Sequence, residues 1–246
     1  MMPKFIDGSN AVVVGSHGGI GNALVTRLNE NRHFNKIFCL SRQTTESDST
    51  KLVHMPCDIT DTDSIESCRD QISDQVEQVD LFFIATGILH NARVEPEKRM
   101  EDLSMLNMQE VFLVNTIAPI LLAKTFAPLM NKEYPAVLAA LSARVGSIAD
   151  NRLGGWYSYR ASKSALNMFL RTFSIEMKRK NPGLIVTLLH PGTTDTKLSK
   201  PFQKNVPAAK LFPAERSAAY LLEVVNSLTP ADSGNFYAWD GRNIEW

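Results

Sequence analysis

Cysteine and histidine, the residues that build disulfide and metal scaffolds, are scarce in this sequence. Its 246 residues contain three cysteines, Cys39, Cys57 and Cys68, and no two of them are spaced as Cys-x-x-Cys. This pattern argues against a disulfide framework, a zinc ribbon and a thioredoxin-type redox pair. The five histidines show no metal-ligand spacing, so we predict no metal site.

A surplus of charge and a long apolar run are also missing. Lys plus Arg and Asp plus Glu both number 26, so the sequence predicts binding neither to nucleic acid nor to an anionic membrane. The longest apolar stretch, residues 111–130, is interrupted by Asn115, Thr116 and two prolines, whereas a membrane span needs ~20 predominantly apolar residues. The first residues contain no long apolar region of the kind found in a secretory signal peptide, so we expect a cytoplasmic protein.

What is present is a regular alternation of short apolar runs and longer amphipathic segments. The near-continuous apolar character of runs such as 80–85 and 184–190 is typical of strands covered on both faces. The alternation predicts one domain, residues 1–246, with an α/β doubly wound (Rossmann) parallel sheet, helices on both faces and strand order 3-2-1-4-5-6-7. The predicted strands are 11–15, 36–40, 52–55, 80–85, 136–142, 184–190 and 235–239, and the predicted helices are 19–31, 61–77, 107–130, 156–180 and 213–228.

A glycine-rich turn lies between the first predicted strand and the first predicted helix. Gly15 permits a tight turn, Gly19 lets a diphosphate approach the helix N-terminus, and Gly21 lets the helix lie close to the sheet. The helix end supplies free N–H groups and a positive dipole for an anion. Glycines also form ordinary turns, but this context favours a dinucleotide site. The cofactor-binding residues predicted here are Gly15, Ser16, His17, Gly19, Ile20 and Gly21.

The end of the second strand predicts which dinucleotide is bound. An acidic residue at this position would bind the ribose 2′-hydroxyl of NAD. The sequence instead has Ser41 and Arg42, and an arginine can pair with the 2′-phosphate of NADP. His17 is a further candidate neighbour of this phosphate. The alternative is that Arg42 is a solvated surface residue; we predict NADP(H) in preference to NAD(H).

Tyr159 and Lys163 form a candidate proton-transfer pair. They are four residues apart in a predicted helix and therefore lie on one helix face. An ammonium near a phenol favours the phenolate, lowers its pKa and allows the tyrosine to act as general acid or base. Taken alone, this spacing is also that of two ordinary helix-surface residues.

Together, these features resemble the short-chain dehydrogenase/reductase family. The glycine turn, Tyr159 with Lys163, Ser142 before them and Asn115 on the preceding long helix follow the family's order. The segments 115–119 and 159–167 and the C-terminal residues are most similar to its C-factor-like and sniffer-like carbonyl reductase branch. The resemblance covers essentially the whole chain. One departure is Ile84-Ala85-Thr86-Gly87 where many members have Asn-Asn-Ala-Gly.

The resemblance implies a role for each of four catalytic residues. Tyr159 would exchange a proton with the substrate oxygen, and Lys163 would lower the pKa of Tyr159 and bind the nicotinamide ribose. Ser142 would donate a hydrogen bond to the substrate oxygen, with Ser147 as a competing serine, and Asn115 would hold a water in a proton relay. The further cofactor contacts that it implies are Asp58, Ile59, Ala85, Thr86, Gly87, Pro191, Gly192, Thr194 and Thr196.

We therefore predict an NADP(H)-dependent oxidoreductase that transfers a hydride between the nicotinamide and a small carbonyl or alcohol substrate. The alternative is a non-catalytic NADP(H)-binding sensor or signalling protein, because a fold does not fix a function. The resemblance also makes residues 197–212 the candidate substrate lid, and the alternative is an ordinary surface loop. The resemblance also implies a homodimer or homotetramer that assembles through the two long predicted helices, 107–130 and 156–180. The alternative is that the apolar faces of these helices are buried within one subunit. Trp156 and Tyr157 fit either the substrate site or the core.

Overall fold

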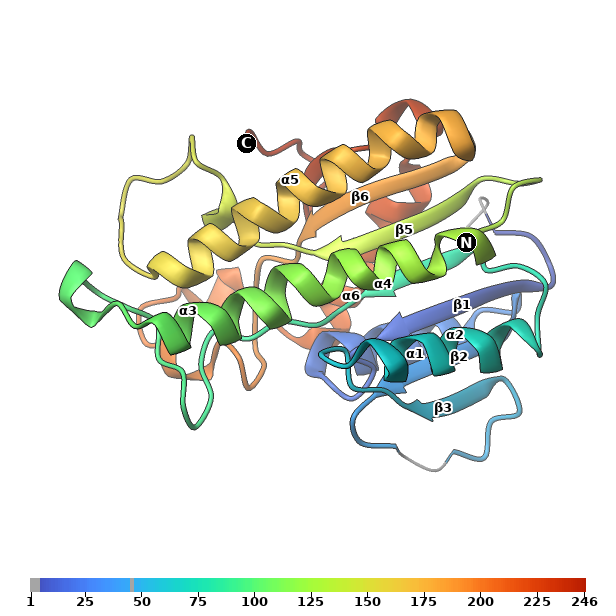
Figure 1. The fold of residues 1–246 in the computed structure, drawn as a ribbon, viewed down its shortest axis with the longest axis horizontal. Coiled ribbons are helices and arrows are strands. Elements are labelled where there is room, and N and C mark those ends of the chain that lie inside the picture. Colours follow the sequence, from blue (N-terminus) through green and yellow to red (C-terminus); the bar gives the residue numbers. More distant parts are fainter. Residues whose placement is uncertain (1–4, 45–46) are drawn as a thin grey trace.

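The computed structural model describes residues 5–44 and 47–246, and a seven-stranded parallel sheet runs through its centre (Figure 1). The strand order is β3-β2-β1-β4-β5-β6-β9. This confirms the predicted order 3-2-1-4-5-6-7, because β7 and β8 lie outside this sheet. The strands are β1 (Ser9–Val14), β2 (Phe34–Ser41), β3 (Leu52–Pro56), β4 (Leu81–Ile84), β5 (Ala136–Leu141), β6 (Leu184–His190) and β9 (Asn235–Ala238).

Helices cover both faces of the sheet, as the apolar runs predict. Alternate residues of a strand point to opposite faces, so Val12 and Val14 pack in one hydrophobic cluster and Ala11 and Val13 in the other. The first cluster is covered by α2 (Thr62–Ser73), α4 (Ala118–Phe126) and α5 (Tyr157–Lys180), and the second by α1 (Gly19–Glu30) and α6 (Ala214–Ser227). Figure 1 shows these helices running beside the strands that they cover.

The prediction of a single continuous helix at 107–130 is wrong, because the structure divides this region into four helical segments. The structure has α3 (Met105–Phe112), a π-helical turn η2 (Leu113–Ile117), α4 and a final 3-10 turn η3 (Ala127–Leu129). Pro119 has no N–H group and cannot donate a hydrogen bond to residue 115, so regular α-helical bonding cannot continue through this region. By length and composition alone, residues 105–129 are apolar enough to cross a membrane, but 44% of the most apolar window is buried inside this fold.

Two further differences concern short elements. The helix expected at 61–77 ends at Ser73, and Asp61 caps its start by accepting a hydrogen bond from the Asp63 N–H at 3.0 Å. The remaining predicted strands and helices begin and end within two residues of the structure. The sequence did not predict β7 (Thr193–Thr194), which pairs with β8 (Leu211–Phe212) outside the main sheet.

Candidate active site

The glycine turn after β1 lies at the edge where the carboxyl ends of the parallel strands meet. Gly15 has a φ of +84°, and a Cβ there would lie 2.9 Å from Thr86 Cγ2. A Cβ on Gly21 would lie 2.1 Å from the Gly15 carbonyl oxygen. Both positions therefore require glycine, and the turn places the start of α1 directly beside the end of β4.

The start of α1 has the properties of an anion site. No described side chain caps this helix, and no acidic residue stands in its first turn. Its first N–H groups and the positive end of its dipole are thus available to a phosphate. Thr86 Oγ1, at the end of β4, is buried without a hydrogen-bond partner among the described residues. The residues at this edge of the sheet fit the diphosphate of a dinucleotide.

The predicted nucleoside end of the site lies at the carboxyl ends of β2 and β3. Asp58 accepts hydrogen bonds from Thr60 N at 2.9 Å and Thr60 Oγ1 at 2.7 Å, and these bonds lower the pKa of the Asp58 carboxyl. The positive charge of Arg42, which follows β2, lowers this pKa further. Arg42 and His17 are exposed, whereas the Ser41 hydroxyl donates to the Gln43 carbonyl. Ile59 is half-buried beside Asp58.

Tyr159 and Lys163 lie on one face of α5, as predicted, and both side chains are buried. The Lys163 ammonium lies 5.9 Å from the centroid of the Tyr159 ring. It donates a hydrogen bond to the Leu141 carbonyl at 2.9 Å, at the end of β5. The pair is therefore anchored to the sheet edge through the lysine.

The expected lowering of the Tyr159 pKa is not found in this structure. Burial raises the pKa of Tyr159 to about 12, because a buried phenolate loses its hydration. Burial also lowers the pKa of Lys163 to about 8. The lysine is bonded to a carbonyl group rather than to the phenol, so its attraction does not offset desolvation. At neutral pH the Tyr159 phenol is therefore protonated and the Lys163 ammonium is mostly charged.

Ser142 follows β5 directly and faces the same helix. Its N–H donates to the Leu189 carbonyl at 2.8 Å, and its hydroxyl lies 2.6 Å from Asn167 Oδ1 on α5. The competing Ser147 accepts a hydrogen bond from Asp150 N at 3.1 Å, within its own loop. Since Asn167 is four residues after Lys163, the structure places Ser142 on the helix face that carries the tyrosine and lysine.

Asn115 lies in the π-helical turn and is fully buried. Its Oδ1 accepts from Ile88 N at 2.7 Å, and its Nδ2 donates to Ile88 O at 2.8 Å and to Ser162 Oγ at 3.2 Å. A Cβ added to Gly87 would lie 3.3 Å from Lys163 Nζ and 3.4 Å from Asn115 Oδ1. Asn115 and Lys163 thus converge on the backbone of Gly87, and the water relay stays a prediction.

The segment after β6 reaches back over the glycine turn. A Cβ on Gly19 would lie 2.7 Å from Thr196 Cγ2, so Thr196 sits against the start of α1. Thr194 is buried, with its hydroxyl 2.7 Å from Ser217 Oγ on α6. Pro191 and Gly192 form the turn between β6 and this segment. Ala85, which directly follows β4, donates its N–H to the Val14 carbonyl at 2.8 Å.

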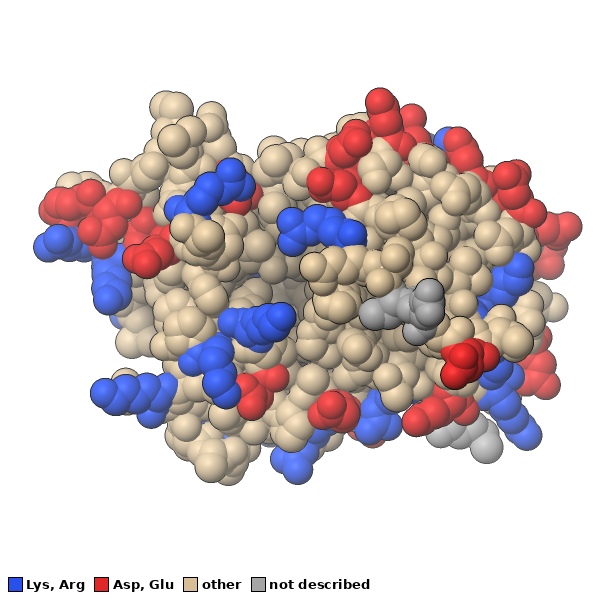
Figure 2. Space-filling view, turned by 90° about the horizontal axis from the view of Figure 1, so that it is seen from below, with Lys and Arg blue, Asp and Glu red and all other residues tan. Residues whose placement is uncertain are grey.

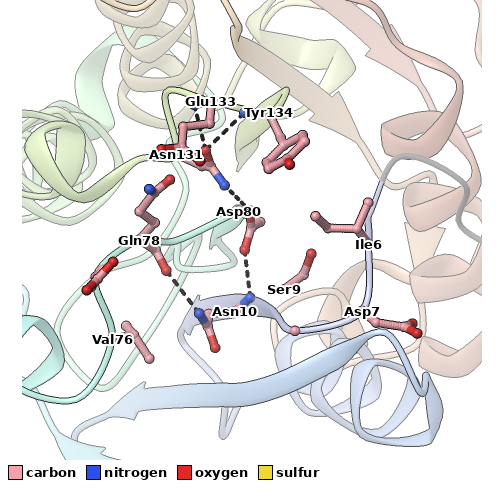
Figure 3. A pocket seen from close by; sticks show the side chains of 12 residues that line it. Ile6, Asp7, Ser9, Asn10, Val76, Gln78, Asp80, Asn131, Glu133 and Tyr134 are labelled. Carbon is pink, nitrogen blue, oxygen red and sulfur yellow. Dashed lines mark hydrogen bonds between the residues drawn. The ribbon is translucent and has the colours of Figure 1, made fainter.

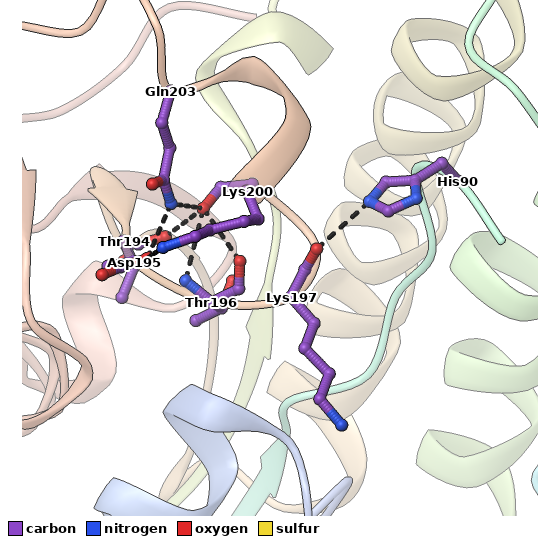
Figure 4. A network of polar contacts seen from close by, with 8 residues as sticks. His90, Thr194, Asp195, Thr196, Lys197, Lys200 and Gln203 are labelled. Atoms are coloured by element: carbon purple, nitrogen blue, oxygen red, sulfur yellow. Dashed lines mark hydrogen bonds and ion pairs between the residues drawn. The ribbon is translucent and has the colours of Figure 1, made fainter.

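The candidate lid is bound to the chain just before it and to the loop after β4. Its last two residues form β8, which pairs with β7 just before the lid, and Asp195, also before the lid, accepts a hydrogen bond from Gln203 Nε2 at 2.8 Å. Figure 4 shows His90, from the loop after β4, directed at the Lys197 carbonyl of the lid. The His90 Nε2 atom lies 3.1 Å from this oxygen and 3.2 Å from the Leu198 oxygen.

Aromatic rings connect the candidate lid to the start of α5. Phe202 of the lid packs edge-on against Trp156, with ring centroids 5.0 Å apart, and Trp156 packs in the same way on Tyr159 at 6.2 Å. Trp156 has a left-handed φ of 51°, which is uncommon for a bulky residue. Trp156 thus lies between Phe202 of the candidate lid and Tyr159, whereas Tyr157 is 44% exposed.

Glu97 is a residue of this site that sequence reasoning missed. Its side chain is 2% exposed, and it accepts hydrogen bonds from Ser158 N at 3.1 Å and from the Ser158 hydroxyl. Its backbone oxygen accepts from Trp156 N at 2.5 Å. A carboxylate at a helix N-terminus stabilises the free N–H groups and the dipole there. Glu97 therefore holds the first turn of the helix that carries Tyr159.

A separate cavity of about 310 Å³ lies at the opposite, amino-terminal edge of the sheet (Figure 3). Asp80 at its centre accepts from Asn10 N and from Asn131 Nδ2, both at 2.7 Å. These bonds tie the start of β1 to the chain before β5. None of the predicted site residues lines this cavity.

Figure 2 shows both signs of charge spread over one face of the molecule, with Lys and Arg beside a hollow near its middle.

Comparison with known proteins agrees with this geometry. Residues 9–207 match the family model for short chain dehydrogenases. The chain is 29% identical over 238 residues to the 1-hydroxy-2-glutathionyl-2-methyl-3-butene dehydrogenase of Rhodococcus sp. (strain AD45). The alignment covers 97% of this chain and 100% of that protein. It is 31% identical over 145 residues, 59% of its length, to C-signal of Myxococcus xanthus, of which 82% is covered.

Among solved structures, the chain resembles the NADPH-bound carbonyl reductase from chicken fatty liver. The TM-score is 0.85 at 25% identity, covering 98% of this chain and 95% of that one. The matches to C-signal and to a carbonyl reductase agree with the expected C-factor-like carbonyl reductase branch. The fold is also shared with the carbonyl reductase Sniffer of D. melanogaster, at a TM-score of 0.83 and 21% identity, covering 98% of this chain and all of that one. The chain belongs to the short-chain dehydrogenase/reductase family and is an oxidoreductase that uses NAD(P).

Proposed function

We propose that this protein reduces a small carbonyl compound to an alcohol with NADPH, with Tyr159 as the proton donor. The observation that carries the proposal is the convergence of Tyr159, Lys163 and Ser142 at the carboxyl edge of the sheet. Lys163 bonds to the end of β5, and Ser142 follows that strand directly. The glycine turn that fits a diphosphate lies at the same edge.

The protein groups divide the work around the substrate oxygen. NADPH, when bound, supplies the hydride that the carbonyl carbon receives. The protonated Tyr159 gives its hydroxyl proton to the carbonyl oxygen, and the neighbouring Lys163 ammonium stabilises the phenolate that is left. Ser142 donates a hydrogen bond to the same oxygen as negative charge develops on it. Asn115 holds the relay water behind Lys163 that returns a proton to the tyrosine.

The preference for NADPH rests on Arg42. Its guanidinium is exposed at the carboxyl end of β2, near enough to Asp58 to affect the pKa of that carboxyl. A guanidinium there binds a 2′-phosphate and has no equivalent partner in NAD. The chicken carbonyl reductase that this chain resembles is described as NADPH-bound, which is consistent with the proposal.

Titration of the purified protein with NADPH and NADH, followed by fluorescence, tests the cofactor assignment. We expect tighter binding of NADPH, and a selective loss of NADPH affinity in Arg42→Ala. Equal affinity for both nucleotides in the wild type would contradict the assignment while leaving the Tyr159 chemistry standing. A carbonyl panel that includes benzil, an activated aromatic diketone, tests turnover. Tight NADPH binding with no turnover of any compound would favour the sensor alternative.

We further propose that the protein works in the cytoplasm. We also propose that a second copy of the chain covers the outer faces of α3 and α5. Both helices expose large apolar side chains, namely Met105, Leu106, Met168 and Phe169. Apolar side chains grouped in this way are a feature of protein interfaces. Light scattering of the wild type and of Phe169→Glu tests the assembly: we expect a dimer or tetramer that dissociates in the variant, and a wild-type monomer would contradict it.

A further inference from the structure

The hydroxyl of Ser142 has a buried partner that the reaction described above does not use. Ser142 Oγ lies 2.6 Å from Asn167 Oδ1, and both side chains are almost fully buried. Asn167 Nδ2 lies 3.5 Å from the Gly146 carbonyl, at the outer limit of a hydrogen bond. In this arrangement Ser142 donates its hydrogen to Asn167.

This bond conflicts with the role of Ser142 toward the substrate. A hydroxyl carries one hydrogen, so a serine that donates to Asn167 has none to give to a carbonyl oxygen. A half-turn of the Asn167 carboxamide about its last torsion exchanges its two ends. Nδ2 then donates to Ser142 Oγ, and the serine hydrogen is free to turn to the substrate. The turn breaks the long contact with Gly146 and leaves Asn167 Oδ1 facing that carbonyl oxygen, which keeps its 2.6 Å bond from Ser164 Oγ.

We propose that Asn167 is a positioning residue that controls the direction in which the Ser142 hydroxyl donates. With Oδ1 toward the serine, the hydroxyl is held away from the substrate; with Nδ2 toward it, the hydroxyl is held ready to donate to the substrate oxygen. The proposal rests on the proposed function, in which Ser142 binds that oxygen. Asn167 acts through Ser142 and does not itself touch the reacting atoms.

The position of Asn167 on α5 supports this assignment. Tyr159, Lys163 and Asn167 follow one another at intervals of four residues, so they share one helix face. Lys163 bonds to Leu141 and Asn167 to Ser142, which are consecutive at the end of β5. One helix face thus positions the proton donor and, through Asn167, the second group that contacts the substrate oxygen.

A double-mutant cycle tests the proposal. The variants are Ser142→Ala, Asn167→Asp, Asn167→Ala and the two double variants, with benzil and NADPH as the probes. A carboxylate at position 167 only accepts, so it retains the serine hydrogen; we expect kcat to fall about 100-fold, as in Ser142→Ala. Asn167→Ala removes both ends of the amide and is expected to lower kcat about tenfold. The NADPH dissociation constant should stay within about twofold in each, which also shows that the variants fold.

The outcome in the Ser142→Ala background decides the question, because independent effects add and effects that act through one group do not. We expect both Asn167 substitutions to lower kcat less than about threefold there. Losses that persist in full would overturn the proposal and leave a purely structural role. An unchanged kcat in Ser142→Ala alone would instead overturn the proposed role of the serine, and this proposal with it.

Ser164→Ala is the matched control. It removes the other side-chain bond that α5 makes to the Gly146 carbonyl without touching Ser142. We expect a lower melting temperature and an unchanged kcat. A fall in kcat as large as that of Asn167→Ala would mean that the attachment of α5 to this loop, rather than the direction of the serine hydroxyl, sets the rate, and would overturn the proposal.

Discussion

Replacing Glu97 by alanine removes two hydrogen bonds from the first turn of α5. Ser158 loses the partner of its N–H at 3.1 Å and of its hydroxyl, and both groups are buried. Hydrogen bonds to a charged group contribute roughly 1.5–3 kcal/mol each, and loss of a helix N-terminal cap costs about 1 kcal/mol. The capping contribution and the hydrogen-bond contributions describe the same bonds and cannot simply be added, so we expect the free energy of unfolding to fall by about 3 kcal/mol.

For a chain of this length, 1 kcal/mol corresponds to a melting shift of roughly 2–4 °C, so Glu97→Ala should unfold about 6–12 °C below the wild type. Thermal unfolding followed by circular dichroism measures the shift. Glu97→Gln keeps the shape and one acceptor, and we expect an intermediate shift. The control is Glu101→Ala, which alters an exposed carboxylate of the same connecting segment. A melting temperature of Glu97→Ala within about 2 °C of that control would refute the reasoning.

Two further predictions concern His190 and the glycine turn. Burial lowers the pKa of His190 to about 4 in the folded protein, whereas its pKa in the unfolded chain is about 6.5. Between these two pH values the unfolded chain therefore binds more protons than the folded protein. The free energy of unfolding should therefore fall by up to about 3 kcal/mol as the pH falls through this window. Urea unfolding at pH 7 and pH 4.5 measures the loss, and an equal loss in His190→Gln would contradict its assignment to this side chain. Gly21→Ala places a Cβ 2.1 Å from the Gly15 oxygen and should weaken NADPH binding more than about 100-fold in a fluorescence titration. Gly183→Ala, whose Cβ meets nothing nearer than 3.7 Å, is its control, and equal affinities would refute the packing argument.

The sheet was predictable because its strands are short apolar runs between polar turns. Residues such as Val12 and Val14 on one face and Ala11 and Val13 on the other are all buried, so the run itself signals a strand. The π-helical turn was not predictable, because it reflects how the backbone adjusts ahead of Pro119. The pairing of β7 with β8 involves two residues on each side, too few for a periodic pattern.

The candidate site was predictable where its residues form a local motif. Tyr159 and Lys163 share a helix face by spacing alone, and the glycines stand together in the chain. The partnerships of Ser142 with Asn167 and of Glu97 with Ser158 join residues 25 and 61 positions apart, and no local pattern signals them. The raised pKa of Tyr159 was missed for a related reason: it depends on burial, which the sequence does not state.

The central claim is that Tyr159 donates the proton in an NADPH-dependent carbonyl reduction. The most direct measurement compares wild type and Tyr159→Phe for NADPH affinity and for benzil turnover in the same preparation. Phenylalanine keeps the ring that packs on Trp156 and removes only the hydroxyl. We expect NADPH affinity to change less than about threefold, and turnover to fall roughly 100-fold or more, as for loss of a general acid. A variant that binds NADPH and still reduces benzil within a few-fold of the wild-type rate would contradict the account.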